Sequence, residues 1–538
     1  MKSYSNSLAL CVAFFMVCSI AGVSAQQAEP VQQPQQGEPS QLPQQPAPSQ
    51  KDSLTLAGEW RGTLKVGASS LRIVFHIVDS GTGYVATMDS PDQGARGIPV
   101  SGVRIEGKGV VIEVASVGGS YTGTLDAVGN QLEGFWNQSG ISFPLTLSRQ
   151  PSAEIHTEQK SMPMKEPASL AYRVKEVRFN GGAEEAQLAG TLTLPKVNGP
   201  FPAVVLVSGS GPQNRDEEIL GHKPFFIIAD YLTQRGIAVL RYDDRGVGAS
   251  TGDYQAATTF DFAADAQAAL DFLARQEGID ENNIGIIGHS EGAIIASILA
   301  AREEISWDGW ASANGAGHED TCDTCGAAGF NETRESSRPA FIVLLAGPGV
   351  QGYELLLMQN EAIGRASGLS GEQIIEANNL NRKLYDIVIE ERDEQLLRKK
   401  LTDVFYEEID LNPVLSPLDK EAQKAQVPQV IAPLLSPWIR TFLELDPADY
   451  LRKVKVPVLA LNGSKDLQVP CKSNLEAIRS ALSEAGNNSS TFVELEGLNH
   501  LFQHATTGLP SEYSEIEEDF APEALQIMGD WILNIISP

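Results

Sequence analysis

Hydrophobic and polar positions alternate with a period of two over residues 53–150. Gly and Asp turns separate short runs of this kind, and such alternation is typical of strands with one buried face. The spacing predicts a small antiparallel β domain, either a barrel or a sandwich. The predicted strands lie at 58–64, 71–78, 83–88, 110–114, 119–125, 131–136 and 143–147.

From residue 170 onward, apolar β-type runs alternate with runs of helical periodicity. The last six β-type runs are nearly continuous in apolar residues, as expected for parallel strands buried on both faces. We therefore predict an α/β fold with a doubly wound, mostly parallel sheet over residues 170–538. Its predicted strands lie at 172–179, 187–194, 203–208, 238–242, 284–289, 340–346, 457–462 and 491–496, and its helices at 224–234, 260–276, 291–301, 472–485 and 522–536.

Two segments interrupt this alternation. Residues 303–337 are rich in Gly, Asp and Ser and are predicted to form a surface excursion. A second segment, about 352–444, combines heavy charge with Leu and Ile stripes, which indicates helices, notably at 373–391 and 393–408. This insertion follows one core strand and precedes the next. We expect it to cap the sheet where the strands end, because ligands bind there in such folds.

The first 52 residues are predicted to be a signal peptide, 1–25, and a linker. Lys2 precedes an apolar stretch at 8–20 that is too short to span a bilayer comfortably, and Val23-Ser24-Ala25 fits a cleavage site. A lipidated Cys18 is a weaker alternative, because the residue before it is not small. Residues 26–52 are dominated by Gln and Pro and are expected to be disordered. We expect a periplasmic or secreted protein without stable membrane insertion, since no later segment is apolar enough to cross a bilayer.

Gly288-His289-Ser290-Glu291-Gly292 lies between a predicted strand and a predicted helix. The G-x-S-x-G pattern in that context describes a nucleophile elbow, a sharp turn that lifts the serine hydroxyl clear of the sheet edge. The glycines are needed because a Cβ on either side would collide with the neighbouring strand or helix. A serine at pH 7 is a poor nucleophile, so Ser290 needs a base and an orienting acid elsewhere.

Asp466 and His500 are the predicted partners of Ser290. Each follows the end of a predicted core strand, and the order Ser, Asp, His is that of hydrolases with an elbow. Asp466 would hold the imidazole of His500 in one tautomer, and His500 would accept the proton of Ser290. Taken alone, Asp466 is more readily explained as a turn-forming aspartate and His500 as a loop histidine with a local partner, and only their joint order and placement favour the catalytic interpretation. His504 is a rival base, which ranks lower because it lies one helical turn beyond the strand-end loop.

Two backbone amides are predicted to form an oxyanion hole. One belongs to Glu291, directly after the nucleophile, where we expect the amide to act rather than the carboxylate. The other belongs to Ser210 in the Gly-rich loop 209–212. A phosphate-binding loop is a weaker interpretation, since no Lys-Ser/Thr pair follows. The Asp- and Arg-rich segment 241–248 ends a strand near the same edge and is expected to brace loops.

The composition argues against several partners and cofactors. The chain of 538 residues carries a formal net charge of −29, so it repels phosphate backbones and nucleic acid is not an expected partner. Export to an oxidising compartment would allow a Cys322–Cys325 disulfide, which the sequence leaves open, and Cys471 is then an odd thiol without a catalytic role. No second pair of ligands accompanies the Cys322 segment, so neither a metal nor a cofactor is predicted. His76 is interpreted as a sheet-face residue, because no carboxylate or thiol is spaced along the chain to join it.

Five short segments carry a family resemblance. They are SGSGPQNRD at 208–216, RYDDRGVGAS at 241–250, GHSEG at 288–292, AGPGV at 346–350 and GLNH at 497–500. They resemble the α/β-hydrolase superfamily, and within it the exported bacterial serine-aminopeptidase-like (S33-type) esterases with an N-terminal small β domain. The resemblance implies a catalytic triad of Ser290, Asp466 and His500, no cofactor, and carboxylic ester substrates with small acyl groups. The chain departs from the pattern in the length of its 303–337 segment and in Cys471, which stands where proline or a polar residue is expected.

Three functions are open at this point. The leading hypothesis is an exported serine hydrolase that cleaves small-molecule esters of short to medium acyl groups, with acetylated carbohydrate as one candidate substrate. The second is a serine aminopeptidase or acyl-peptide hydrolase, which needs an acidic residue for the substrate ammonium. Glu390-Glu391 and Glu407-Glu408 are candidates, although a solvated helix face is the simpler interpretation. The third is a non-catalytic secreted binding protein on a hydrolase scaffold. A glycan contact through the small β domain rests on fold-level analogy alone.

Overall fold

The computed structural model describes residues 56–536, except 67–68, 80–83, 91–94, 101, 115–118, 127–128, 139–140, 150–170, 184–185 and 302–335. The predicted signal peptide, the Gln/Pro-rich linker and the Cys322–Cys325 pair lie outside the described residues. The described residues divide into two compact units, 56–149 and 171–536.

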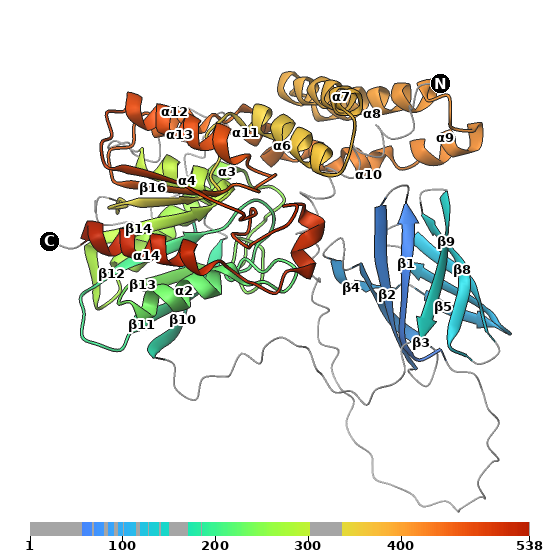
Figure 1. The fold of residues 1–538 in the computed structure, drawn as a ribbon, viewed down its shortest axis with the longest axis horizontal. Helices are drawn as coiled ribbons and strands as arrows, with labels where there is room; N and C mark the ends of the chain where they lie inside the picture. Colours follow the sequence, from blue (N-terminus) through green and yellow to red (C-terminus); the bar gives the residue numbers. More distant parts are fainter. Residues whose placement is uncertain are drawn as a thin grey trace, which may run out of the picture. The chain divides into compact units, whose positions relative to one another are not determined.

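The first unit is an antiparallel β structure of nine strands (Figure 1). Its sheet order is β4-β3-β2-β1-β9-β8-β7-β6-β5, and β3 also contacts β5, so the sheet curls until its two ends approach each other in a barrel-like form. The alternating pattern turns one face of each strand inward, onto a core that includes Trp60, Phe75, Tyr121 and Trp136. The strands are β1 (Gly58–Val66), β2 (Ser69–Asp79), β3 (Tyr84–Ser90), β4 (Ala95–Pro99), β5 (Gly102–Glu106), β6 (Gly109–Val114), β7 (Gly119–Leu125), β8 (Gln131–Gln138) and β9 (Ile141–Arg149).

Two features of this unit differ from the sequence-based expectation. Strands β4 and β5 are absent from the sequence-based prediction. Each has only five residues and contains glycine or proline, which are typical of turns. His76 does lie on the sheet face, but carboxylates do join it. Its Nε2 lies 2.9 Å from Asp89 Oδ2 and its Nδ1 lies 3.6 Å from Glu59 Oε2. Both partners sit on neighbouring strands, where spacing along the chain does not reveal them.

The second unit contains an eight-stranded sheet in the order β10-β11-β13-β12-β14-β15-β16-β17. Strands β12 to β17 run parallel, whereas β11 pairs antiparallel with both of its neighbours. The predicted, mostly parallel sheet is therefore present. Its strands are β10 (Tyr172–Asn180), β11 (Gln187–Pro195), β12 (Phe201–Val207), β13 (Ala238–Tyr242), β14 (Ile279–His289), β15 (Ile342–Leu345), β16 (Val458–Gly463) and β17 (Ser490–Leu495).

Helices cover both faces of this sheet (Figure 1). One core lies under α2 (Pro224–Gln234) and α14 (Pro522–Ile536), and the other under α3 (Thr259–Ala274), α4 (Glu291–Ala300) and α13 (Cys471–Glu484). Successive residues of a central strand enter opposite cores, which explains why these strands are apolar throughout.

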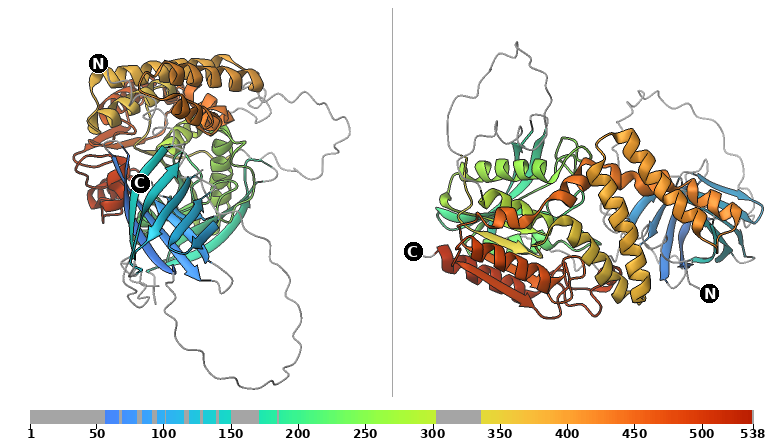
Figure 2. Two further views of the ribbon diagram at one scale, coloured as in Figure 1. Left: turned by 90° about the vertical axis from the view of Figure 1, so that its right-hand side faces the viewer. Right: turned by 90° about the horizontal axis from the view of Figure 1, so that it is seen from above.

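A helical insertion separates β15 from β16, as predicted for this part of the chain (Figure 2). Side-chain caps at Ser370, Asp393, Ser416 and Ser436 begin four of its helices. Helix α11 contacts α3, so the insertion packs against the sheet unit at that point, and a further short helix, α12 (Pro447–Leu451), precedes β16. The elements are α6 (Gly352–Ala366), α7 (Gly371–Glu390), α8 (Glu394–Leu411), α9 (Pro417–Lys424), α10 (Val427–Ile431), the 3₁₀ turn η4 (Ala432–Leu435) and α11 (Pro437–Glu444).

We expect Gly285→Ala in strand β14 to destabilise the sheet unit. A Cβ at this position would lie 2.2 Å from the buried ring of Phe341. Overpacking of a core typically lowers the free energy of unfolding by about 1–3 kcal/mol. Gly371→Ala at the start of α7 is the matched control, because nothing lies within 4 Å of its added Cβ. Denaturant unfolding compares the two, and equal midpoints would contradict the packing described for β14.

Candidate active site

Ser290 sits in a strained turn between strand β14 and helix α4. Its φ is +54°, a left-handed value that non-glycine residues rarely adopt, and its N–H donates to the Leu345 carbonyl oxygen at 2.9 Å. A Cβ at Gly288 would lie 2.0 Å from the Gly292 oxygen, and one at Gly292 would lie 2.1 Å from the Val207 oxygen. The two glycines are therefore required by close backbone contacts, as the predicted elbow demands.

Asp466 and His500 form a buried hydrogen-bonded pair after β16 and β17. His500 Nδ1 lies 2.8 Å from Asp466 Oδ2, while Asp466 Oδ1 accepts the backbone N–H groups of Gln468 and Val469. These bonds hold the carboxylate in place beneath the imidazole. A proton on Nδ1 leaves Nε2 of the neutral ring as the basic nitrogen.

The loops that carry Ser290 and His500 converge on one edge of the sheet. Strands β14, β16 and β17 run parallel, so their carboxyl ends share that edge. The ring of His289, directly before the nucleophile, lies 4.7 Å from the ring of His500 between centroids. Gly209 approaches from the loop after β12, where an added Cβ would lie 3.0 Å from the Ser290 Cβ. The predicted site residues therefore come from separate segments that meet at the elbow.

Glu291 has a role that the sequence did not indicate. Its buried Oε1 accepts the hydroxyl of Thr259 at 2.6 Å and the indole N–H of Trp438 at 2.8 Å. The hydroxyl of Ser210 also hydrogen-bonds to this carboxylate, and burial raises the pKa of Glu291 overall. The side chain thus joins helix α3, the Gly-rich loop and helix α11 of the insertion. No local pattern could reveal this, because Trp438 lies 147 positions away.

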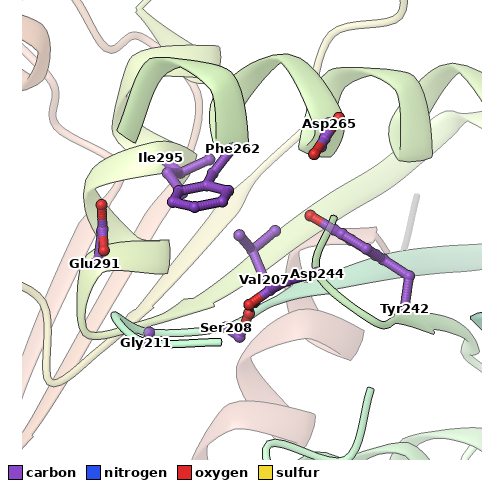
Figure 3. Close-up of a pocket in the computed structure, with 10 residues that line it drawn as sticks. Val207, Ser208, Gly211, Tyr242, Asp244, Phe262, Asp265, Glu291 and Ile295 are labelled. Atoms are coloured by element: carbon purple, nitrogen blue, oxygen red, sulfur yellow. Dashed lines mark hydrogen bonds between the residues drawn. The ribbon is translucent and has the colours of Figure 1, made fainter. Parts of the chain in front are cut away.

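A small cavity borders the Gly-rich loop beside Glu291 (Figure 3). Its volume is about 10 Å³, room for about one water molecule. Ser290 and His500 are not among its lining residues, so it adjoins the candidate catalytic pair rather than containing it. It is lined by Val207, Ser208, Gly209, Gly211, Tyr242, Asp244, Phe262, Asp265, Glu291 and Ile295.

The Asp- and Arg-rich segment after β13 braces loops, as its composition predicted. The guanidinium of Arg215 makes two hydrogen bonds to Asp243, at 3.0 and 2.8 Å. Asp244 accepts the Ser208 hydroxyl at 2.9 Å, and burial raises the pKa of this carboxyl well above its usual range. Arg245 bonds Asp265 of α3 at 2.7 Å. These contacts anchor the chain on both sides of the Gly-rich loop.

The remaining candidates make no hydrogen bond to the Asp466–His500 pair. His504, the rival base, is 56% exposed at its side chain and contacts Glu518 and Glu523 at 2.9 and 3.0 Å. Cys471 is buried at the start of α13. Over the described ranges, no three His, Cys, Asp or Glu side chains are grouped to hold a metal ion. Within those same ranges, no helix has the length and apolarity needed to cross a membrane.

The strand order and the strained serine between a parallel strand and a helix define the α/β-hydrolase class of fold. The resemblance seen in the motifs is confirmed by a family model, that of the serine aminopeptidase family S33, which matches residues 224–323. The chain is also similar to esterase EstD of Thermotoga maritima, with 36% identity over 134 residues. That match spans 25% of this chain and about a third of the esterase, 31%.

Two solved esterases have distantly similar structures. One, from Pyrococcus furiosus, is 13% identical with a TM-score of 0.36, and the match covers 68% of this chain and 93% of the other. The other is Est1E from Butyrivibrio proteoclasticus with ferulic acid bound, 15% identical with a TM-score of 0.35, covering 67% and 97%. The fold assignment therefore rests on the strand order and the elbow of this chain.

We expect Cys471 to be unreactive toward thiol reagents in the folded protein. Burial, with the nearby charges of Glu494 and Asp466, raises the pKa of its thiol from 9.0 to about 12. Such a shift lowers the thiolate fraction near pH 8 by about 1000-fold, and the thiolate is the reactive form. Iodoacetamide labelling of a variant with serine at the other four cysteine positions, native against urea-unfolded, measures this. Rapid labelling of the native protein would contradict the burial described.

Proposed function

We propose that this protein is an exported serine hydrolase that cleaves carboxylic esters with short to medium acyl groups. The observation that carries the proposal is Ser290, held at positive φ on the sheet edge where the hydrogen-bonded pair of Asp466 and His500 also lies. That combination supplies a nucleophile held clear of the sheet edge, a base, and an acid that orients the base. Export rests on the signal-like residues 1–25 of the sequence.

The proposed reaction proceeds through an acyl-enzyme. His500 Nε2 takes the proton from the Ser290 hydroxyl as its oxygen attacks the ester carbonyl, and Asp466 stabilises the imidazolium that forms. The backbone amides of Ser210 and Glu291 stabilise the oxyanion. The tetrahedral intermediate collapses, and the alcohol leaves with the proton from His500. A water activated by His500 then attacks the acyl-enzyme, which releases the carboxylic acid and restores Ser290.

Ester hydrolysis is favoured over aminopeptidase activity by the positions of the acidic side chains. Glu391 is paired with Lys400 at 2.8 Å and Glu407 with Lys383 at 3.0 Å on the insertion. These carboxylates already have cationic partners. Glu291 is nearest in sequence to the nucleophile, but its carboxylate is buried with three donors from the protein. The similarity to an esterase points the same way, whereas the name of the matched family keeps the aminopeptidase as second candidate.

Helix α11 of the insertion is proposed to help select the acyl group. Trp438 stacks on Phe442 with ring centroids 4.9 Å apart, and its indole reaches the carboxylate next to the nucleophile. An apolar pair in this position would contact an acyl chain bound at Ser290. The insertion would therefore act on substrate choice rather than on the chemistry.

We expect Ser290→Ala and Asp466→Asn each to lower kcat for p-nitrophenyl acetate by about 10⁴-fold or more, with the fold retained. The first removes the nucleophile and the second favours the wrong tautomer of His500. His504→Gln is the matched control, because this exposed histidine should leave kcat within about twofold. Turnover in Ser290→Ala at the wild-type rate would refute the triad. Failure of a fluorophosphonate probe to label Ser290 would favour the non-catalytic binding protein instead.

A substrate series separates the two enzymatic candidates. We expect p-nitrophenyl esters of two to eight carbons to be cleaved with higher kcat/KM than amino-acyl p-nitroanilides, by about 100-fold or more, because an unpaired ammonium in the site is costly. N-acetylated amino-acyl anilides serve as the control for the free amine. A strong preference for substrates with a free amine would reverse the ranking in favour of the aminopeptidase.

A further inference from the structure

Two buried residues beside the proposed triad have no part in the reaction described above. Glu217 and His289 are 1% and 5% exposed, and His289 Nδ1 lies 2.9 Å from Glu217 Oε1. A buried histidine and carboxylate are costly to desolvate unless they satisfy each other and further partners. Their remaining hydrogen bonds are therefore informative.

Those bonds connect the three loops that carry the proposed machinery. His289 Nε2 lies 2.9 Å from the backbone oxygen of His500, so it holds the main chain of the base. Glu217 Oε1 accepts the backbone N–H of Gly209 at 2.8 Å, directly before the proposed oxyanion residue Ser210. His289 itself precedes the nucleophile. One pair of side chains thus connects the oxyanion loop, the elbow and the base.

The hydrogen-bond partners determine the protonation of this pair. A carbonyl oxygen can only accept, so Nε2 of His289 must carry a proton to bond His500. A second proton must then lie in the bond between Nδ1 and Glu217, because a lone pair there would face a carboxylate. The negative charge of Glu217 and its hydrogen bond raise the pKa of His289 although burial alone would lower it, and Asp466 acts in the same direction. The pair is neutral in total, so it places no net charge beside the imidazole of His500.

The backbone of Glu217 adopts an unfavourable conformation that keeps its side chain in this position. Its φ of +50° is in the left-handed region, which a non-glycine residue occupies only when its surroundings require it. Apolar side chains, among them Phe225, Ile228 and Phe502, line a small cavity that also borders the pair. A low-dielectric environment of this kind strengthens a satisfied polar network and penalises a broken one.

We propose that Glu217 and His289 form a positioning dyad that sets the backbone of His500 and the oxyanion loop relative to Ser290. The proposal rests on the proposed function and deepens it. Both residues are buried, so we assign them no contact with the substrate. Their effect is on the alignment of groups that contact it, and a misplacement of about 1 Å can cost about 100-fold in rate.

The chain offers a control with the same hydrogen-bond pattern at another place, where the side chain of Asp519 is 43% exposed and that of Glu217 is 2% exposed. His222 bonds Asp519 through Nδ1 at 2.9 Å and the carbonyl oxygen of Tyr513 through Nε2 at 2.9 Å. This pair holds the 3₁₀ turn η5 (Pro510–Glu515), which carries none of the proposed catalytic groups. Substitution of its carboxylate tests what a purely structural dyad contributes.

The kinetic experiment compares Glu217→Gln with Asp519→Asn, using p-nitrophenyl acetate and thermal unfolding. We expect Glu217→Gln to lower kcat by about 10–100-fold with KM within about twofold, because alignment is lost rather than binding. We expect Asp519→Asn to lower the unfolding temperature about as much as Glu217→Gln does, while its kcat stays within about twofold of the wild-type value. Equal kcat losses in the two variants, or an unchanged kcat in Glu217→Gln, would overturn the proposal.

A second readout needs no turnover and so separates this proposal from the proposed function. In protein labelled with ¹⁵N-histidine, we expect His289 to keep both ring nitrogens protonated at about pH 8, where an ordinary histidine is neutral. The signal is assigned by its loss in His289→Asn. In Glu217→Gln we expect this ring to lose its second proton. A His289 that is singly protonated at about pH 8 in the wild-type protein would overturn the dyad, whatever substrate the enzyme takes.

Discussion

The close approach of helix α4 to the end of strand β12 constrains the whole candidate site. A Cβ at Gly292 would lie 2.1 Å from the carbonyl oxygen of Val207, so the first turn of α4 rests directly on the backbone that enters the Gly-rich loop. Ser290 is held in its left-handed conformation at the same junction. Backbone contacts of this kind leave little freedom, so Ser290 and the Gly-rich loop are positioned together.

Buried carboxylates secure this junction, and each one connects segments that are distant in the chain. Glu291 joins helices α3 and α11, Glu217 joins the Gly-rich loop to the elbow, and Asp466 holds His500. A buried carboxylate without its donors is costly, so each network favours one arrangement of the loops around it. The proposed reaction depends on that rigidity, since its groups must be aligned before the substrate arrives.

The sheet unit and its insertion have different roles in the proposed function. The sheet presents the proposed nucleophile, base and orienting acid at one edge, where the parallel strands end. The insertion reaches the elbow through Trp438, whose indole bonds the carboxylate of Glu291. Reaction class and substrate preference would then change independently, because different segments carry them.

Local sequence patterns determined most of the elements and the three proposed catalytic residues. Strand β13 and helices α2 and α14 have the predicted bounds, because periodicity and helix signals act over a few residues. The placement of Ser290, Asp466 and His500 after strand ends could be predicted, and parallel strands end at one edge. Short strands bounded by turn residues, such as β4, could not.

Only the tertiary structure decided which side chains support these residues. Glu217 and His289 are 72 positions apart, and Glu291 and Trp438 are 147 apart, so no periodicity or spacing marks them as partners. Whether a buried carboxylate is paired depends on donors that folding brings to it. The sequence by itself therefore determined which groups could react, and the packed fold decided how they are held, because hydrogen bonding in a buried site depends on distances in space.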